Sequence, residues 1–342
     1  MILILDTPGF RLGRRSGRIV VRYSDGRKPS EIPIVELDAV IVSARGSVST
    51  DAVRLLSLNG IPIVFAGRFS PYAVTHPFFM HGTVLTRREQ MRAYDDWRGV
   101  YLAKMFCYAT TVNKARVLQY FAKSRSYDAE LAERLERCSE TIMGFAERIM
   151  SEDGRLDDIR MRIMGHEGEA ANIYFDAVRL LVPEDLGFEG RERRPPRDPV
   201  NATLSYGYTI LNSICALALS KCGLEPYAGF LHADRSGKPS LLLDLSEEFR
   251  QPFIDTMVIG LFSKRSLGME HFDFNEDDMV YLNSEGKKVF FGALNRRLKK
   301  IVRNPYGKKL TFRGCIMRQA RNVARFLLGT RKEYRPFIWG WS

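Results

Sequence analysis

The sequence is poor in cysteine, and its cysteines lack the spacing of a structural site. The five cysteines are odd in number and form no Cys-x-x-Cys pair; they are Cys107, Cys138, Cys215, Cys222 and Cys315. This pattern argues against a disulfide framework and against a zinc site built from thiolates. We therefore expect free thiols that are mostly buried.

Long apolar runs are also missing. No run approaches the length of about 20 residues that spans a bilayer. The apolar start of the chain reaches a charge at Asp6, which is too early for the apolar core of a secretory signal. We expect no membrane association and a cytoplasmic location.

Several common catalytic templates are absent. The sequence contains no Gly-x-Ser-x-Gly elbow and no His-Glu-x-x-His helix, and residues 236–240 lack the glycine spacing of a phosphate-binding loop. No internal repeat or low-complexity tract is present either. None of these local templates therefore predicts the chemistry of the chain.

The composition is that of a globular chain with two domains. Of the 342 residues, 45% are apolar and 27% are charged, which allows a substantial core and exceeds the usual size of one domain. Short Ile- and Val-rich runs predict strands, and one helix capped by Ser49 or Thr50 and ended by Asn59-Gly60 interrupts them. Strands are predicted at 2–5, 18–23, 31–33, 39–41 and 61–65, and helices at 91–123, 127–151, 156–182, 203–221, 245–261 and 311–328.

These elements predict an α+β fold. A small β-rich N-terminal domain, residues 1–85, precedes a larger all-α catalytic domain, residues 86–342. The connector at 190–199 contains three prolines and cannot be helical.

Positive charge is concentrated at the C-terminal end. The formal net charge is +12, but residues 286–342 carry 16 Lys or Arg against a single acid, Glu333, so the rest of the chain is slightly acidic. A solvated, partly disordered tail is one interpretation. Regularly spaced apolar residues favour an ordered segment, in which the last helix places Arg318, Arg321 and Arg325 together for phosphate contacts.

Glu167 is the first candidate for chemistry. Helical spacing places it beside Ala170, Ala171 and Tyr174 and not on the outer polar face. The neighbouring Gly165 and Gly168 each cost roughly 1 kcal/mol in a helix, which suggests close approach of another backbone or a phosphate. The alternative is a surface glutamate near an ordinary helix crossing.

An imidazole and a pair of carboxylates follow. His232 comes 12 residues before Asp244, and Asp244 and Glu247 are three residues apart, on one helical face. Two carboxylates held together repel each other unless a cation lies between them, and carboxylates with an imidazole suit a divalent ion. The alternative is an exposed helix start, where acids are favoured by the macrodipole.

Taken together and in this order, the motifs resemble the CRISPR-associated spacer integrases, the family of the first Cas protein. The resemblance spans almost the whole chain. It is carried by Asn-Gly-Ile-Pro-Ile-Val-Phe (59–65), Gly-His-Glu-Gly-Glu-Ala-Ala (165–171), Arg-Pro-Pro (194–196) with Asp-Pro-Val-Asn (198–201), Leu-Ser-Tyr-Gly-Tyr (204–208), Gly-Leu-Glu-Pro-Tyr (223–227) and Asp-Leu-Ser-Glu-Glu-Phe-Arg (244–250).

The resemblance implies a catalytic Mg²⁺ or Mn²⁺ ion and the partners that act with it. Glu167 and His232 match metal ligands of the family, and the third ligand comes from the acidic pair. Glu247 is the favoured direct ligand, although Asp244 can share or exchange the task. His166 departs from the family's pattern, either as a supporting donor or as a packed imidazole. The expected partners are double-stranded and branched DNA, a second copy of the chain, and the small ferredoxin-like second Cas protein.

The expected activity is that of a metal-dependent DNA endonuclease and strand transferase that inserts short foreign fragments into a repeat array as new spacers. Two alternatives remain: a nuclease that acts on branched DNA in repair, and a non-catalytic DNA-binding scaffold. Backbone phosphates are expected to contact basic side chains without base reading. These side chains are Arg194, Arg197, Arg235, Lys238, Arg250, Arg318 and Arg321.

Overall fold

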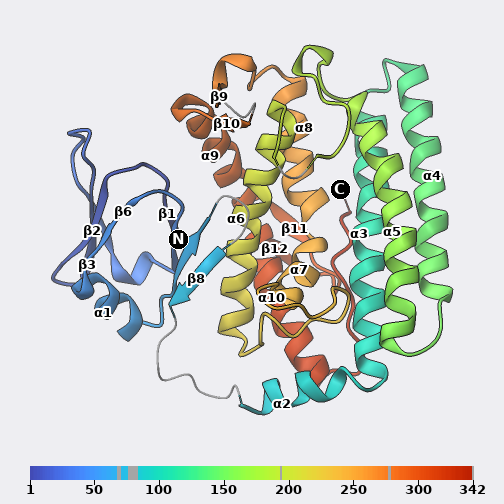
Figure 1. Cartoon of the computed structure of the whole chain (residues 1–342), viewed down its shortest axis with the longest axis horizontal. Coiled ribbons are helices and arrows are strands. Elements are labelled where there is room, and N and C mark those ends of the chain that lie inside the picture. Colours follow the sequence, from blue (N-terminus) through green and yellow to red (C-terminus); the bar gives the residue numbers. More distant parts are fainter. Residues whose placement is uncertain (68–70, 76–83, 193–194, 276–278, 341–342) are drawn as a thin grey trace.

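The computed structural model has a strand-rich N-terminal part followed by a larger helical part (Figure 1). This is the predicted α+β fold. The structure describes residues 1–67, 71–75, 84–192, 195–275 and 279–340. The last strand of the N-terminal part ends at Thr75 and the first helix of the helical part begins at Val84. The predicted boundary between residues 85 and 86 stays a prediction.

Two four-stranded sheets form the N-terminal part. One has the order β1-β5-β7-β8, with parallel pairing except for antiparallel β8, and the other has the order β4-β3-β2-β6. The helix α1 (Thr50–Leu58) is capped by Ser49, whose side chain accepts the amide of Ala52. The strands are β1 (Ile2–Leu5), β2 (Phe10–Arg15), β3 (Arg18–Arg22), β4 (Ser30–Pro33), β5 (Ala39–Val42), β6 (Gly46–Val48), β7 (Ile63–Ala66) and β8 (Pro71–Thr75).

Long helices build the second part. Aspartates cap three of them, because Asp96, Asp128 and Asp198 each accept a backbone amide of the first turn. The helices are α2 (Val84–Ala93), α3 (Trp97–Ser124), α4 (Ala129–Ser151), α5 (Leu156–Arg179), α6 (Pro199–Lys221), α7 (Ser240–Glu247), α8 (Thr256–Ser263), α9 (Ser284–Lys299) and α10 (Phe312–Leu327).

Short elements complete the helical part. Two hairpins, β9 (Phe272–Phe274) with β10 (Val280–Leu282) and β11 (Ile301–Arg303) with β12 (Lys309–Thr311), are additions to the helices that the sequence predicted. One turn of π-helix joins α7 to α8. The remaining short segments are the π-helix Arg250–Asp255 and the 3₁₀ turns Ile34–Glu36, Glu184–Leu186 and Met269–His271.

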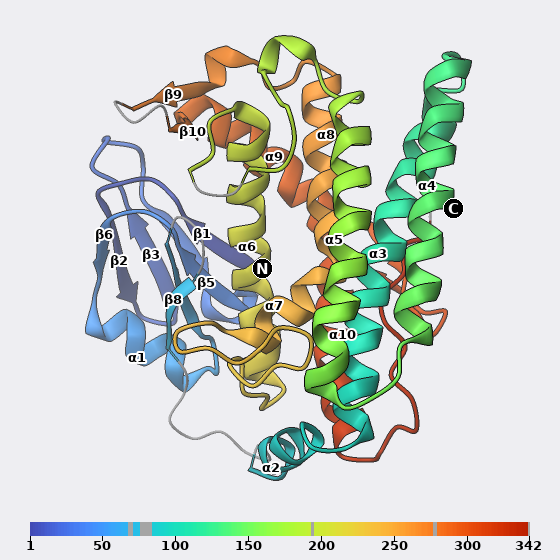
Figure 2. The same ribbon diagram turned by 45° about the vertical axis from the view of Figure 1, so that its right-hand side comes forward.

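Helix α6 runs through the middle of the molecule, between the strand-rich part and α3 and α5, in both Figure 1 and Figure 2. It is long and apolar enough to cross a membrane by length and composition, so the expectation that no segment would pass this test is wrong. Its most apolar window is 83% buried inside the molecule, as in the core helix of a globular domain. The helix α7, which carries Glu247, and the π-helical turn after it both pack against this core helix.

The cysteines are free, as expected. Cys107, Cys215 and Cys315 are buried, and Cys138 and Cys222 are half-buried. Burial raises the pKa of each of these thiols, that of Cys315 to about 12, so they pack as small apolar side chains.

Candidate functional site

A cavity of about 290 Å³ lies among α3, α5, α6 and α7. Residues from all four helices and from the loop before α7 line it, so it joins segments that are more than a hundred residues apart in the sequence. Its polar and charged lining residues are Thr110, Lys114, Glu167, Arg191, Ser205, Tyr208, Asn212, His232, Glu247, Arg250 and Gln251. Three of the four predicted metal-binding side chains are in this set.

Glu167 reaches the cavity from α5. Its side chain is 26% exposed, and Lys114 Nζ on α3 lies 2.6 Å from its Oε1. A Cβ at Gly165 or Gly168 would have no atom within 4 Å, so the close backbone approach predicted at these glycines is wrong. A phosphate on this open face stays a prediction.

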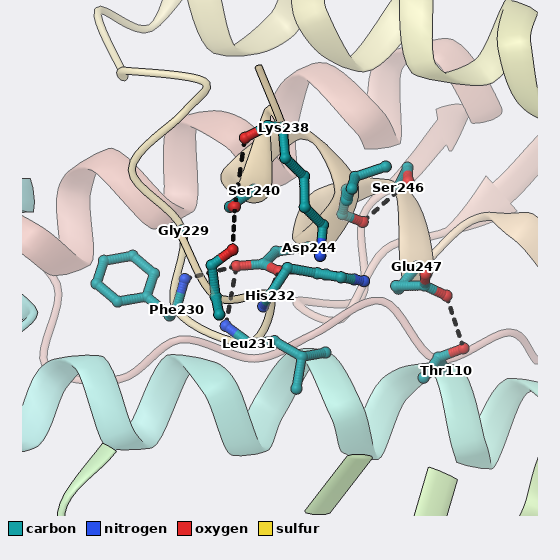
Figure 3. A network of polar contacts seen from close by, with 12 residues as sticks. Thr110, Gly229, Phe230, Leu231, His232, Lys238, Ser240, Asp244, Ser246 and Glu247 are labelled. Atoms are coloured by element: carbon teal, nitrogen blue, oxygen red, sulfur yellow. Dashed lines mark hydrogen bonds and ion pairs between the residues drawn. The ribbon is translucent and has the colours of Figure 1, made fainter. Parts of the chain in front are cut away.

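His232 is held by Asp244, as Figure 3 shows. Asp244 Oδ1 lies 2.8 Å from His232 Nδ1 and also accepts the His232 amide, while Oδ2 accepts the amides of Phe230 and Leu231. Asp244 is fully buried and does not line the cavity. The Nδ1 bond fixes the tautomer and leaves Nε2 as the ring nitrogen that can take a ligand.

Glu247 enters the cavity from the last turn of α7. Thr110 Oγ1 donates to its Oε2 at 3.2 Å, and Arg250 pairs with its Oε1. The side chain is only 10% exposed, so these partners replace most of its contact with water. Asp244 and Glu247 share a helical face as predicted, but they differ in environment: one carboxylate is enclosed by backbone amides and the other faces the cavity.

The donor types that face the cavity fit a divalent cation. Among the residues that the structure describes, no three His, Cys, Asp or Glu side chains lie close enough together to hold a metal ion as they stand. Two carboxylates and one imidazole nevertheless face one small cavity, and these are ligands that Mg²⁺ and Mn²⁺ accept. Each of these carboxylates also has a cationic partner, which is Lys114 for Glu167 and Arg250 for Glu247.

Several cavity residues escaped the sequence analysis. Lys114 is the clearest: its side chain is 2% exposed, and helical spacing places it on the face of Cys107, Thr111 and Leu118. A lysine inside such an apolar stripe is a signal that could have found it. Tyr208 and Arg191 also line the cavity. Tyr208 ends the motif at 204–208, but the sequence analysis gave neither residue a role.

His166 lies outside this cavity. Its Nε2 is 3.1 Å from Glu152 Oε1, and its ring is 6.4 Å from that of Phe145. Of the two roles expected for His166, the contacts match a packed imidazole on the α4 side of α5.

The seven predicted DNA-contacting side chains do not form one group. Arg250 lines the cavity, and Figure 3 shows Lys238 extending toward the His232–Asp244 pair. Arg197 and Arg235 are exposed on loops, and Arg321 is exposed on α10, where Arg318 is half-buried. Arg194 lies outside the described residues. The contacts of these side chains with DNA stay predictions.

Comparisons with known proteins identify the family. The family model described as "CRISPR associated protein Cas1" matches residues 3–296. The chain is 36% identical to "CRISPR-associated endonuclease Cas1 1" of Archaeoglobus fulgidus over 100% of both chains. It is also 36% identical to the Thermus thermophilus protein of the same name, covering 99% of this chain and 100% of that one.

Solved structures share the fold. A casposase bound to an integration product has a TM-score of 0.82 at 23% identity, covering 97% of this chain and 92% of that one. A Cas1 protein from Thermotoga maritima has a TM-score of 0.77 at 22% identity over the full length of both chains. A Cas6-RT-Cas1–Cas2 complex has a TM-score of 0.82 at 20% identity, covering all of this chain and 36% of the matched one. The family model and the full-length relatives show that the chain belongs to the Cas1 family.

Proposed function

We propose that this chain is a divalent-metal-dependent DNA endonuclease and strand transferase that inserts short foreign DNA fragments into a CRISPR repeat array. The observation that carries the proposal is the convergence of Glu167, His232 and Glu247, from three separate segments, on one cavity. The names of the full-length relatives support nuclease chemistry, and the casposase bound to an integration product supports strand transfer on this fold.

Glu167, Glu247 and His232 Nε2 would hold the ion, and Asp244 would orient the imidazole without binding. When bound, Mg²⁺ or Mn²⁺ polarises a phosphodiester and stabilises the attacking and leaving oxygens. Lys114 and Arg250, which pair with these carboxylates, also line the cavity and would contact the phosphate oxygens of the DNA there.

The reaction exchanges one phosphodiester for another. The 3′-hydroxyl of the fragment attacks phosphorus at the repeat border, a new P–O bond forms, and the 3′-oxygen of the cut strand leaves with a proton. Water in place of the 3′-hydroxyl gives the endonuclease reaction. In neither case does a side chain of the protein form a covalent bond with DNA.

The partners proposed are DNA, a second copy of the chain and the small ferredoxin-like second Cas protein. Support for the last comes from the Cas6-RT-Cas1–Cas2 complex, in which part of one chain has this fold. We also propose a cytoplasmic location, where such DNA substrates are found.

A strand-transfer assay on a supercoiled plasmid with a repeat array tests the function. Wild-type protein, with the second Cas protein and Mn²⁺, should join a short duplex to the array, whereas Glu167→Ala and His232→Ala should not. Glu169→Ala is the matched control, because Glu169 is exposed two residues away on the same helix. Duplex affinity should be nearly unchanged in all variants.

A fragment with a dideoxy 3′ end separates the alternatives. Integration requires the 3′-hydroxyl, so this fragment should not be joined. A repair nuclease would cut branched DNA equally well with either fragment present and would show no preference for the repeat array. Full strand transfer by Glu167→Ala or His232→Ala would contradict the assignment of the site.

A further inference from the structure

A second cleft, of about 620 Å³, lies where the C-terminal end of α3 meets α8 and α9. In Figure 1 and Figure 2, α8 lies between α9 and α3. This cleft shares no lining residue with the cavity of Glu167 and His232. Nothing in the proposed chemistry uses it.

The charges of this cleft are of one sign. Among the described residues, its lining includes five cationic side chains and no Asp or Glu: Arg125, Lys264, Arg296, Arg297 and Lys300. The nearby acids are already engaged, because Asp128 caps α4 by accepting the amide of Leu131, and Asp185 pairs with Arg265. The cleft therefore concentrates positive potential between low-dielectric walls.

Because several of these cationic side chains are partly buried, keeping them charged costs free energy. Burial lowers the pKa of Arg125 and Lys300, and it lowers that of Arg297 to about 10; for none of the three does a carboxylate act against the effect. Arg297 lies over the ring of Phe312 at 4.8 Å and donates to the carbonyl of Pro252, while its Nε is buried without a hydrogen-bond partner among the described residues. An anion in the cleft would offset this cost.

Aromatic side chains accompany the charges. Tyr120, Phe121 and Tyr127 also line the cleft, and Tyr127 is 85% exposed. Cationic grooves with aromatic side chains are the pattern of single-stranded nucleic-acid sites, in which phosphates follow the charges and unpaired bases stack on rings. In a duplex, the bases are already stacked on one another and cannot stack on the ring of Tyr127.

We propose that the cleft between α3, α8 and α9 binds a single-stranded segment of the DNA substrate. Lys264, Arg296 and Lys300 contact the phosphates at its exposed rim, and Tyr127 stacks on an unpaired base. The inference rests on the proposed function only in taking DNA as the polyanion, because it concerns binding and not the chemistry at Glu167.

A charge-removal variant tests the phosphate contacts. Lys264, Arg296 and Lys300 are exposed, so the triple Lys264→Ala/Arg296→Ala/Lys300→Ala should fold normally. We expect its affinity for a single-stranded oligothymidylate to fall about tenfold at about 0.1 M salt, with a slope of log K against log salt that is shallower by about 2. Fluorescence anisotropy with the full chain measures both.

Lys299→Ala/Arg303→Ala/Lys309→Ala is the matched control. It removes the same charge from exposed positions of the basic C-terminal segment, but none of its residues lines the cleft. We expect a loss below about threefold, since only the general field changes. Unchanged binding by the cleft variant, or an equal loss in the control, would overturn the proposal.

Tyr127 distinguishes unpaired DNA from any other polyanion. Tyr127→Ala should weaken oligothymidylate binding about fivefold and leave inorganic polyphosphate binding unchanged, while Tyr127→Phe keeps the ring and the affinity. If Tyr127→Ala weakened neither ligand, the cleft would be a general polyanion site and the single-strand assignment would be wrong. Failure of the wild-type chain to transfer strands, with its oligothymidylate binding intact, would contradict the proposed function at the metal site and not the proposal for this cleft.

Discussion

At the scale of single residues, the carboxylates that face the cavity are each held by a cation of the protein itself. Glu167 pairs with buried Lys114, and Glu247 pairs with Arg250. Removing one member of a buried pair leaves the other charge uncompensated, which destabilises the folded state more than the pair stabilises it. If the proposed ion binds at Glu167 and Glu247, it competes with these lysine and arginine side chains for the two carboxylates.

Lys114→Met tests this competition. Without Lys114, the Glu167 carboxylate loses its partner, and we expect the free energy of unfolding to fall by about 3 kcal/mol in the absence of divalent ions. Added Mn²⁺ should restore more stability to this variant than to the wild type, because it neutralises Glu167. Urea unfolding with and without Mn²⁺ measures both effects.

Lys123→Met on the same helix is the control for that experiment, because Lys123 is exposed. It should leave stability within about 0.5 kcal/mol of the wild type. Equal stabilisation of wild type and Lys114→Met by Mn²⁺ would show that the ion does not compete with Lys114.

Asp244 is a positioning residue by its contacts. Its oxygens take three backbone amides and His232 Nδ1, all within 3.0 Å. Asp244→Asn places an amide group against at least one of these donors, so we expect a loss of about 3 kcal/mol in stability. Because the imidazole loses its orientation, Mn²⁺ affinity should also fall about 10- to 100-fold.

Asp234→Asn, in the exposed part of the same loop, serves for comparison and should change Mn²⁺ affinity little. Retention of wild-type Mn²⁺ affinity in Asp244→Asn would refute the positioning role. Thermal unfolding and a Mn²⁺ titration of the same samples give the two numbers.

At the scale of elements, periodicity and caps predicted most helices. The errors lie where a local feature interrupts the pattern. The expected helix at 245–261 instead begins at Ser240, and Pro252, which has no amide hydrogen, lies in a π-helical turn that separates α7 from α8. The expected helix at 91–123 is divided at Asp96, which caps α3. The strand β2 was missed because three of its six residues are arginine, which hides its alternation.

The site was less predictable than the fold. Glu167, His232 and Glu247 were nominated by the motifs around them, but Lys114, the partner of Glu167, and Thr110, a partner of Glu247, come from a helix that only the tertiary structure brings to the cavity. A second hydrogen-bond network also joins segments that are distant in the sequence, because Tyr174 of α5 and Tyr208 of α6 donate to Asp255. Contacts between elements follow from packing, which no local pattern records.

This network predicts a pH dependence. Burial raises the pKa of Asp255 from 3.8 to about 6, although both tyrosines act to lower it. The folded state thus holds a proton that the unfolded chain releases, so the contribution to stability is complete below pH 3.8 and is lost as the pH rises through about 6. Relative to Asp255→Asn, the wild type should lose about 2 kcal/mol between about pH 4 and pH 7.

Urea unfolding of both proteins across that range measures the difference. Asp176→Asn on α5 is the control, since Asp176 is exposed and near Tyr174, and its difference from the wild type should not vary in this way. A constant difference between wild type and Asp255→Asn would contradict a buried carboxyl that takes up a proton on folding.

At the scale of the whole molecule, the basic C-terminal segment is ordered and does not form a tail. Its residues build α9 and α10 and the hairpin between them, and its arginines and lysines point to different surfaces. Those of α9 meet α3 and α8 in the second cleft, whereas Arg321 and Arg325 are exposed on α10. The positive charge is thus distributed around the helical part, as expected for a protein that holds an extended polyanion.

The predicted homodimer belongs to this scale. Light scattering of the purified chain should give twice the monomer mass, and the mass should stay constant on dilution to low micromolar concentration, as for an interface of standard size. A monomer mass over the whole concentration range would contradict the dimer. The two ends of a DNA fragment would then have to be joined by two separate molecules of the chain.

The convergence of Glu167, His232 and Glu247 on one ion is tested most directly by a Mn²⁺ titration followed by electron paramagnetic resonance. We expect one ion per wild-type chain, the same binding in Glu169→Gln, and at least about tenfold weaker binding in Glu167→Gln, His232→Asn and Glu247→Gln. Binding by these three variants that equals the wild type would contradict a metal site in this cavity.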